Sequence, residues 1–279
     1  MDSWFAAIVF LYGLVAGSFL NACIWRIPRH ESMWQRSHCP CCRNKIAFYD
    51  NIPIVSYLVL LGRCRSCGAR ISWRYPLLEF GTAILFLGLL WRFGFSWTLM
   101  AVVPFLCMLV ALIFIDLEHM ILPDIITLPG ALAGLLLSVW QDPVFYFDPL
   151  LVDLVSKAVP VAWQDRAVAV CGSLLGLLIG GGLLWLVAEV YYRLRKMEGL
   201  GFGDVKMMAM VGTFLGWKYT LLTIFLGSFS GAILGMLYIR IRKLDLRHQL
   251  PFGVFLGLAA IVVLLFGPEM LGWYLDLFQ

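Results

Sequence analysis

The sequence predicts an all-α polytopic membrane protein with about eight transmembrane helices and one small polar loop domain. Three observations support this prediction: the composition, a series of long apolar runs, and the confinement of charge to a few loops. Hydrophobic residues make up 62% of the 279-residue chain and charged residues 14%, and the mean hydropathy is +0.88. Globular proteins have about 45–50% apolar and about 25% charged residues. The composition therefore excludes a large soluble domain, and basic residues beside apolar runs argue against a nucleic-acid partner.

The first apolar run, Trp4–Trp25, is long enough to cross about 30 Å of hydrocarbon, which takes about 20 residues. No basic residue precedes it, and Arg26 and Arg29 follow it, so we expect a retained helix rather than a cleaved signal peptide. Its Gly17 and Ser18 are small residues typical of close helix packing. Seven further runs complete the predicted set: Leu77–Trp91, Phe95–Ile115, Ile125–Trp140, Ala167–Tyr191, Val205–Trp217, Tyr219–Ile239 and Phe252–Phe266.

The distribution of Lys and Arg predicts the orientation of these runs, because basic residues accumulate on the cytoplasmic side. If the polar section Arg26–Arg74 is cytoplasmic, the outside keeps only four of the 21 basic residues, namely Arg92, Lys157, Arg166 and Lys218. Both termini then lie outside, as does a loop at 141–166 with a short surface helix around Leu150–Val159. The same topology brings the end of the third run and the start of the sixth to the cytoplasmic face.

An aspartate stands at each of those two positions. Asp116 closes the run Phe95–Ile115, and Asp204 follows Gly201-Phe202-Gly203 at the start of Val205–Trp217. A charged side chain costs about 2.5–3.5 kcal/mol at the centre of a membrane helix, so such acids are candidates for function. Two carboxylates at one depth can share a water molecule, as in an aspartic protease. Two alternatives remain open: Asp204 acts only as a helix cap, or the two acids form the proton or ion relay of a transporter regulated by the polar loop.

Five of the eight cysteines lie in the polar section, and four of them form two C-x-x-C pairs, Cys39 with Cys42 and Cys64 with Cys67. Four thiolates in two such pairs suit one tetrahedral Zn²⁺ ion. A loop of this size builds little core, so a metal would supply much of its folding energy. Because cytosolic redox conditions disfavour disulfides, the sequence predicts one structural zinc ion per chain. Cys41 lies between two of the ligands and is a competing thiol.

Several motifs follow one another along nearly the whole chain: Gly17–Asn21 with Trp25–Pro28, the cysteine pairs around Asn51–Tyr57, Arg74–Glu79, Ile115–His119 with Leu122–Asp124, Gly199–Lys206, and Pro251–Gly253. In this order they resemble the motifs of bacterial prepilin peptidases, the bifunctional leader peptidases and N-methyltransferases of type IV pilus and type II secretion systems. Several motifs in family order are more specific than any one of them alone.

The resemblance implies that Asp116 and Asp204 are the catalytic pair of a peptidase in the bacterial inner membrane, with its active site at the cytoplasmic face. It implies a type IV prepilin or type II pseudopilin as substrate and S-adenosylmethionine as methyl donor. Asn21 and Glu79 are candidates for the methyl-donor region; a helix-packing amide and a partner for Arg74 are the respective alternatives.

The expected domain organisation is a first transmembrane helix at 1–25, a zinc-binding loop domain linked to methyl transfer at 26–76, and a membrane-embedded peptidase domain at 77–279. A peptidase without methyltransferase activity is the nearest alternative. Asp124 is expected to cap the fourth apolar run. Lys206 is either a flanking charge or a group that acts on Asp204 or on a substrate carboxyl.

Overall fold

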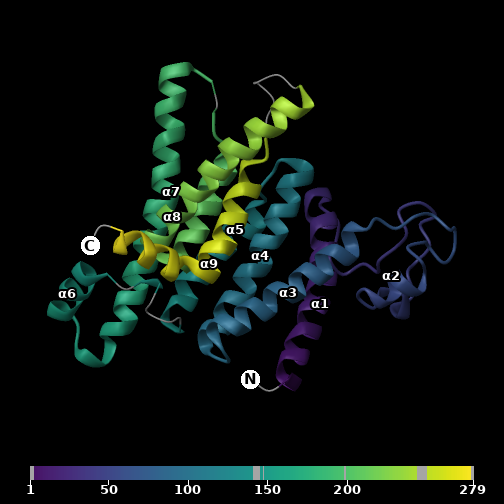
Figure 1. Cartoon of the computed structure of the whole chain (residues 1–279), viewed down its shortest axis with the longest axis horizontal. Coiled ribbons are helices and arrows are strands. Elements are labelled where there is room, and N and C mark those ends of the chain that lie inside the picture. Colours follow the sequence, from purple (N-terminus) through teal and green to yellow (C-terminus); the bar gives the residue numbers. More distant parts are fainter. Residues whose placement is uncertain (1–2, 141–144, 147, 198, 244–249, 278–279) are drawn as a thin grey trace. The chain divides into compact units, whose positions relative to one another are not determined.

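The computed structural model describes residues 3–140, 145–146, 148–197, 199–243 and 250–277. The described part is helical and contains two isolated β-bridges but no named strand. It divides into two compact units, Met1–Phe95 and Ser96–Gln279, each of which is described by itself below (Figure 1).

The first unit is built on two long helices, α1 (Ser3–Arg26) and α3 (Arg74–Phe93), which pack against each other. Gly17 permits their close approach, because a Cβ atom there would lie 2.6 Å from the Cα atom of Glu79. The polar section joins the two helices through three short elements, η1 (Ile27–Arg29), η2 (Phe48–Asn51) and α2 (Val55–Val59).

The second unit contains the remaining helices in chain order: α4 (Trp97–His119), α5 (Asp124–Leu137) with η3 (Ser138–Trp140), α6 (Pro149–Ala158), η5 (Val161–Trp163), α7 (Gln164–Arg195), α8 (Phe202–Arg242) and α9 (Phe252–Asp276). Helix α6 confirms the short helix predicted around Leu150–Val159, and Asp148 caps it by accepting the N–H groups of Leu150 and Leu151. Residues 141–144 and 147 of the predicted outer loop lie outside the described residues.

Helix α8 is bent back on itself at Gly216, whose backbone (φ 69°, ψ 172°) is not helical. Gly180 of α7 shows the reversal, because its missing side chain would meet both the Met208 carbonyl and the Thr220 methyl. Twelve residues of unbroken helix would separate those two positions by about 18 Å. Just before the break, the Thr213 carbonyl accepts hydrogen bonds from the hydroxyls of Tyr146 (2.9 Å) and Ser173 (2.8 Å).

The predicted count of about eight transmembrane helices is not confirmed. Six described helices are long and apolar enough to cross a membrane: α1, α3, α4, α7, α8 and α9. The predicted runs Val205–Trp217 and Tyr219–Ile239 are the two arms of α8 on either side of Gly216. The predicted run Ile125–Trp140 corresponds to the apolar segment Asp124–Trp140, which is shorter than the six candidate spans. The chain is a multi-pass membrane protein, and large apolar side chains are exposed along these helices, where acyl chains would cover them.

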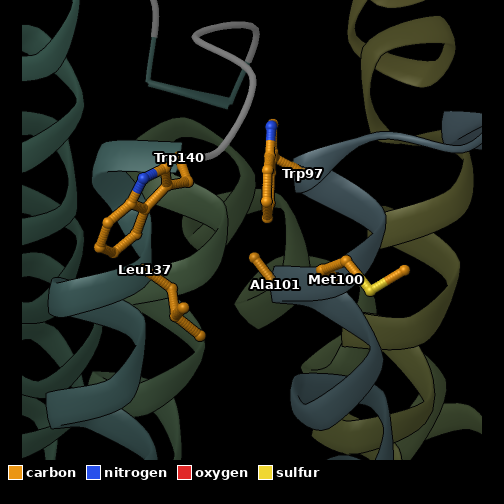
Figure 2. Close-up of a pocket in the computed structure, with 5 residues that line it drawn as sticks. All are labelled: Trp97, Met100, Ala101, Leu137 and Trp140. Carbon is orange, nitrogen blue, oxygen red and sulfur yellow. The ribbon is translucent and has the colours of Figure 1, made fainter.

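An apolar hollow of about 260 Å³ opens between the start of α4 and the end of α5 with η3. Figure 2 shows Leu137 and Trp140 on one side of it and Trp97, Met100 and Ala101 on the other. It lies at the opposite end of α4 from Asp116 and contains no charged group. Paired tryptophans are typical of the membrane–water interface, so we assign this hollow to the lipid boundary and not to chemistry.

Candidate active site and metal centre

Asp116 and Asp204 are both buried and lie at helix ends of the second unit. Asp116, 5% exposed, is in the last turn of α4, which Met120 ends in a left-handed conformation by donating its N–H to the Asp116 carbonyl at 2.8 Å. Asp204, 7% exposed, is in the first turn of α8 after Gly201. The charge of Asp116 acts electrostatically on the Asp204 carboxyl. The fold thus brings together two acids that are 88 positions apart in the sequence.

The start of α9 contributes a third element to this site. The Val254 N–H donates to Asp116 Oδ2 at 3.1 Å, and the Gly253 N–H also interacts with this carboxyl. A helix N-terminus carries partial positive charge, which suits a carboxylate. The sequence gives Pro251–Gly253 only as part of a family pattern and does not predict this contact. A glycine in the first turn of an apolar helix, two residues after the proline at its N-cap, is the signal that could have indicated a close approach there.

Asp124 does not have the role that the sequence predicted, and it pairs with Lys206 instead. The cap position of α5 is Pro123, with no side-chain cap bond, so the prediction that Asp124 caps the helix is wrong. Asp124 is instead the first helical residue, and both of its carboxylate oxygens lie 2.7 Å from Lys206 Nζ. A helix-capping residue uses its carboxylate on its own backbone, whereas this carboxylate pairs with a side chain 82 positions away.

The four predicted metal ligands meet in the polar section of the first unit. The sulfur atoms of Cys39, Cys42, Cys64 and Cys67 all lie within 4.8 Å of one another, and those of Cys39 and Cys67 are 3.9 Å apart. A tetrahedral zinc ion with Zn–S bonds of about 2.3 Å requires sulfur separations of about 3.8 Å. The residues present therefore fit a Cys₄ zinc site. Cys41 is exposed and is not a member of the cluster.

The two cysteine pairs lie on two turns of the same design, 25 positions apart. The N–H of Cys39 donates to the Asn44 carbonyl and that of Cys64 to the Ala69 carbonyl, while Arg43 and Gly68 close the turns with positive φ angles. The bridges His38–Lys45 and Arg63–Arg70 repeat in the same way, although the sequence shows no repeat by eye. Backbone N–H groups of Cys67 and Ser66 lower the pKa of the Cys64 thiol to about 7, which favours the thiolate that zinc binds.

The two cysteine turns, 39–43 and 64–68, are called knuckles below. An ion pair connects the second knuckle to η2. Arg65 donates two hydrogen bonds to Asp50, at 2.8 and 2.6 Å. Arg65 lowers the pKa of the Asp50 carboxyl. A bidentate pair of this kind fixes direction as well as distance, so it holds the second knuckle against the stretch between the two cysteine pairs.

Asn21 and Glu79 lie in a separate buried polar cluster between α1 and α3. Asn21, 4% exposed, donates to the Tyr75 carbonyl at 3.2 Å, and within the described residues its Oδ1 atom has no hydrogen-bond partner. Glu79 accepts the N–H of Ile54 at 2.7 Å and a hydrogen bond from Ser18. Ile54 has a φ of 60°, which is rare for a β-branched residue. The cluster is thus a polar site in an otherwise apolar helix pair.

These features define a polytopic helical membrane protein with a buried pair of aspartates at its helix ends and a Cys₄ metal-binding loop. Residues 11–93 match the model of the bacterial peptidase A24 N-terminal domain, and residues 103–236 match that of the type IV leader peptidase family. The chain belongs to the type IV leader peptidase family.

Relatives similar over nearly their whole length carry the name prepilin leader peptidase/N-methyltransferase. A protein of Pseudomonas putida is 33% identical over 96% of this chain and 93% of its own. One from Pseudomonas aeruginosa is 34% identical over 98% and 94%, and one from Aeromonas salmonicida is 35% identical over 97% and 94%. No solved structure matches the chain significantly.

Proposed function

We propose that this protein cleaves the leader peptide of type IV prepilins and then N-methylates the new N-terminal residue. Two findings support this proposal: the chain belongs to the family, and it is similar to named peptidase/methyltransferases over most of its own length and of theirs. The observation that carries the peptidase half is the pair of buried, electrostatically interacting carboxyls of Asp116 and Asp204. Pseudopilins of type II secretion belong to the same proposed substrate class.

Asp116 and Asp204 are the proposed catalytic pair. Two carboxyls that share one site hold a single proton between them, because two adjacent negative charges repel. The ionised carboxylate takes a proton from a water molecule, and the protonated carboxyl donates a hydrogen bond to the scissile carbonyl. Water then attacks the carbonyl carbon directly, so no acyl-enzyme forms. The N–H groups at the start of α9 orient the Asp116 carboxylate during this step.

The loop and the α1–α3 pair are the proposed methyl-transfer region. Cys39, Cys42, Cys64 and Cys67 would hold one Zn²⁺ ion that stabilises the loop. S-adenosylmethionine, when bound, supplies an electrophilic methyl group. We assign Asn21 and Glu79 to its surroundings, because the Oδ1 of Asn21, which has no partner among the described residues, is a buried acceptor suited to a ligand donor. The proposed organisation is a first helix at 1–25, a loop for methyl transfer at 26–76 and a peptidase region at 77–279, whose first helix, α3, also contributes Glu79 to the methyl-transfer region.

The proposed setting is the bacterial inner membrane, with both termini in the periplasm and both aspartates at the cytoplasmic face. The balance of basic residues supports this orientation. A basic leader would remain inside while the apolar helix that follows it stays in the bilayer, so the cleavage point would meet the helix ends that carry the two acids.

The experiment that tests this function incubates the purified protein with a synthetic leader-bearing pilin peptide, with and without S-adenosylmethionine. Mass spectrometry should show loss of the leader in both reactions and a further gain of one methyl group only with the donor. Cleavage without methylation would show that the protein is a peptidase without methyltransferase activity. An unchanged peptide would exclude the peptidase and favour a transporter that uses the two acids as a relay.

Gly253→Ala is expected to slow leader cleavage by on the order of 100-fold, the cost of about 1 Å of misplacement at a reacting group. An added Cβ would lie 2.9 Å from Asp116 Oδ2 and 3.0 Å from Leu122 Cδ1, so the carboxyl must move. Gly272→Ala is the matched control in the same helix, because a Cβ there has nothing within 4 Å. The measurement is the rate of cleavage of the pilin peptide by each variant; equal rates in the two variants would contradict the prediction.

A further inference from the structure

Lys206 and Asp124 form an ion pair whose role neither the family match nor the proposed catalytic pair explains. Lys206 Nζ lies 2.7 Å from both oxygens of Asp124, so it bridges the two carboxylate oxygens. Lys206 also lies over the ring of Phe202, 5.1 Å from its centroid, on the same side of the first turn of α8. The lysine is thus held by one partner on its own helix and one on α5.

This ion pair is one of three contacts between the first turn of α8 and a single stretch of chain, 116–124. Asp204 interacts with Asp116. Gly203 packs against Leu122, since a Cβ on Gly203 would lie 2.9 Å from the Leu122 Cβ. Lys206 pairs with Asp124. Leu122 lies between Asp116 and Asp124 in this stretch, whereas Gly203 precedes both Asp204 and Lys206 in α8.

The contact between Gly203 and Leu122 can act as a pivot for rotation of the first turn of α8. Successive residues of an α-helix point about 100° apart. If Gly203 faces Leu122, Asp204 projects about 100° to one side of it and Lys206 about 60° to the other. A rotation of the first turn about this pivot would therefore move the Asp204 carboxyl towards or away from Asp116 unless the opposite side is held. Gly203 itself offers no side chain to resist such a rotation.

We propose that the Lys206–Asp124 ion pair is a positioning device that sets the rotation of the first turn of α8 and thereby the separation of the Asp116 and Asp204 carboxyls. This inference depends on the proposed peptidase function of those two acids. Neither Lys206 nor Asp124 takes part in the chemistry. Their side chains are 25% and 56% exposed, and ion pairs this open contribute little to stability. The pair therefore acts on the rate of cleavage and not on folding.

The test compares variants of the full-length purified protein in leader cleavage. Lys206→Met and Asp124→Asn remove one charge each, and the double variant Lys206→Asp with Asp124→Lys exchanges them. The matched control is Lys157→Met, which breaks an ion pair of the same residue types in α6. We expect each single variant to lower kcat about twofold to fivefold, the range that an exposed ion pair can supply, with KM unchanged. We expect the exchange to restore most of the loss and the control to match the unmodified protein.

Three outcomes would overturn the inference. Single variants that cleave at the unmodified rate would show that the pair positions nothing. A loss of kcat that the charge exchange does not relieve would exclude pairing as the cause. A rise in KM for Lys206→Met but not for Asp124→Asn would make the lysine a substrate-binding residue. If the unmodified protein cleaves no peptide, the proposed function has failed instead, which separates the two questions.

Discussion

Asp204→Asn is expected to abolish leader cleavage, with a loss of at least about 1,000-fold. Asparagine keeps the size of the side chain and its place beside Gly201, but it can neither take a proton from water nor give one to the scissile carbonyl. A positioned acid or base contributes about 10²–10⁴-fold. Asp116→Asn should lose as much, and the double variant little more, because the two carboxyls act as one unit. The measurement is peptide cleavage followed by mass spectrometry.

Asp153→Asn is the control for these variants, since Asp153 is an exposed acid of α6 in the same compact unit. Methylation of a peptide that already lacks its leader should continue in the Asp204 and Asp116 variants, which shows that the protein remains folded. Retention of cleavage by either variant would refute the catalytic assignment.

Cys64→Ser is expected to lower the zinc content from one ion per chain to near zero and to open the loop to proteolysis. Removing one of four thiolates leaves an incomplete tetrahedral site, and structural zinc sites contribute about 10–16 kcal/mol of apparent binding energy in isolated zinc-finger peptides. Methyl transfer should be lost with the loop. Leader cleavage should persist, because Asp116 and Asp204 belong to the other compact unit.

Cys41→Ser provides the matched control for the metal prediction, since Cys41 lies beside Cys42 in the sequence but outside the sulfur cluster. Elemental analysis and limited proteolysis of the two variants measure the effect. A Cys41 variant that loses its metal, or a Cys64 variant that retains one ion, would contradict the ligand set.

The local parts of this structure were predictable from the sequence. Each C-x-x-C pair closes a turn of a few residues, so its spacing alone indicates that Cys39 and Cys42 share a ligand site. That both pairs share one site could be predicted because structural zinc sites are four-coordinate, so one ion needs all four sulfurs. The helical segments were equally accessible, because long apolar runs have no other stable form in a bilayer.

The parts that depend on contacts between distant segments were harder to predict from the sequence. Nothing local in Pro251–Gly253 shows that this turn meets Asp116, since that contact depends on the absence of a side chain at Gly253. The break at Gly216 agrees with the two predicted runs Val205–Trp217 and Tyr219–Ile239, whereas the packing of both arms against Gly180 of α7 depends on a residue remote in sequence. The partner of Asp124, Lys206, is 82 positions away, so the sequence around Asp124 favours the role of a helix cap.

The unusual backbone of Ile54 links the metal loop to the membrane helices. A β-branched residue with a φ of 60° costs about 1–3 kcal/mol, which neighbouring structure must supply. Ile54 lies between the two knuckles, and its N–H holds the Glu79 carboxylate of α3. If the metal were removed and the knuckles came apart, Ile54 would relax to an ordinary conformation and release that carboxylate. The contacts of the Glu79 carboxylate, within the helix pair, would therefore depend on whether the loop holds its metal ion.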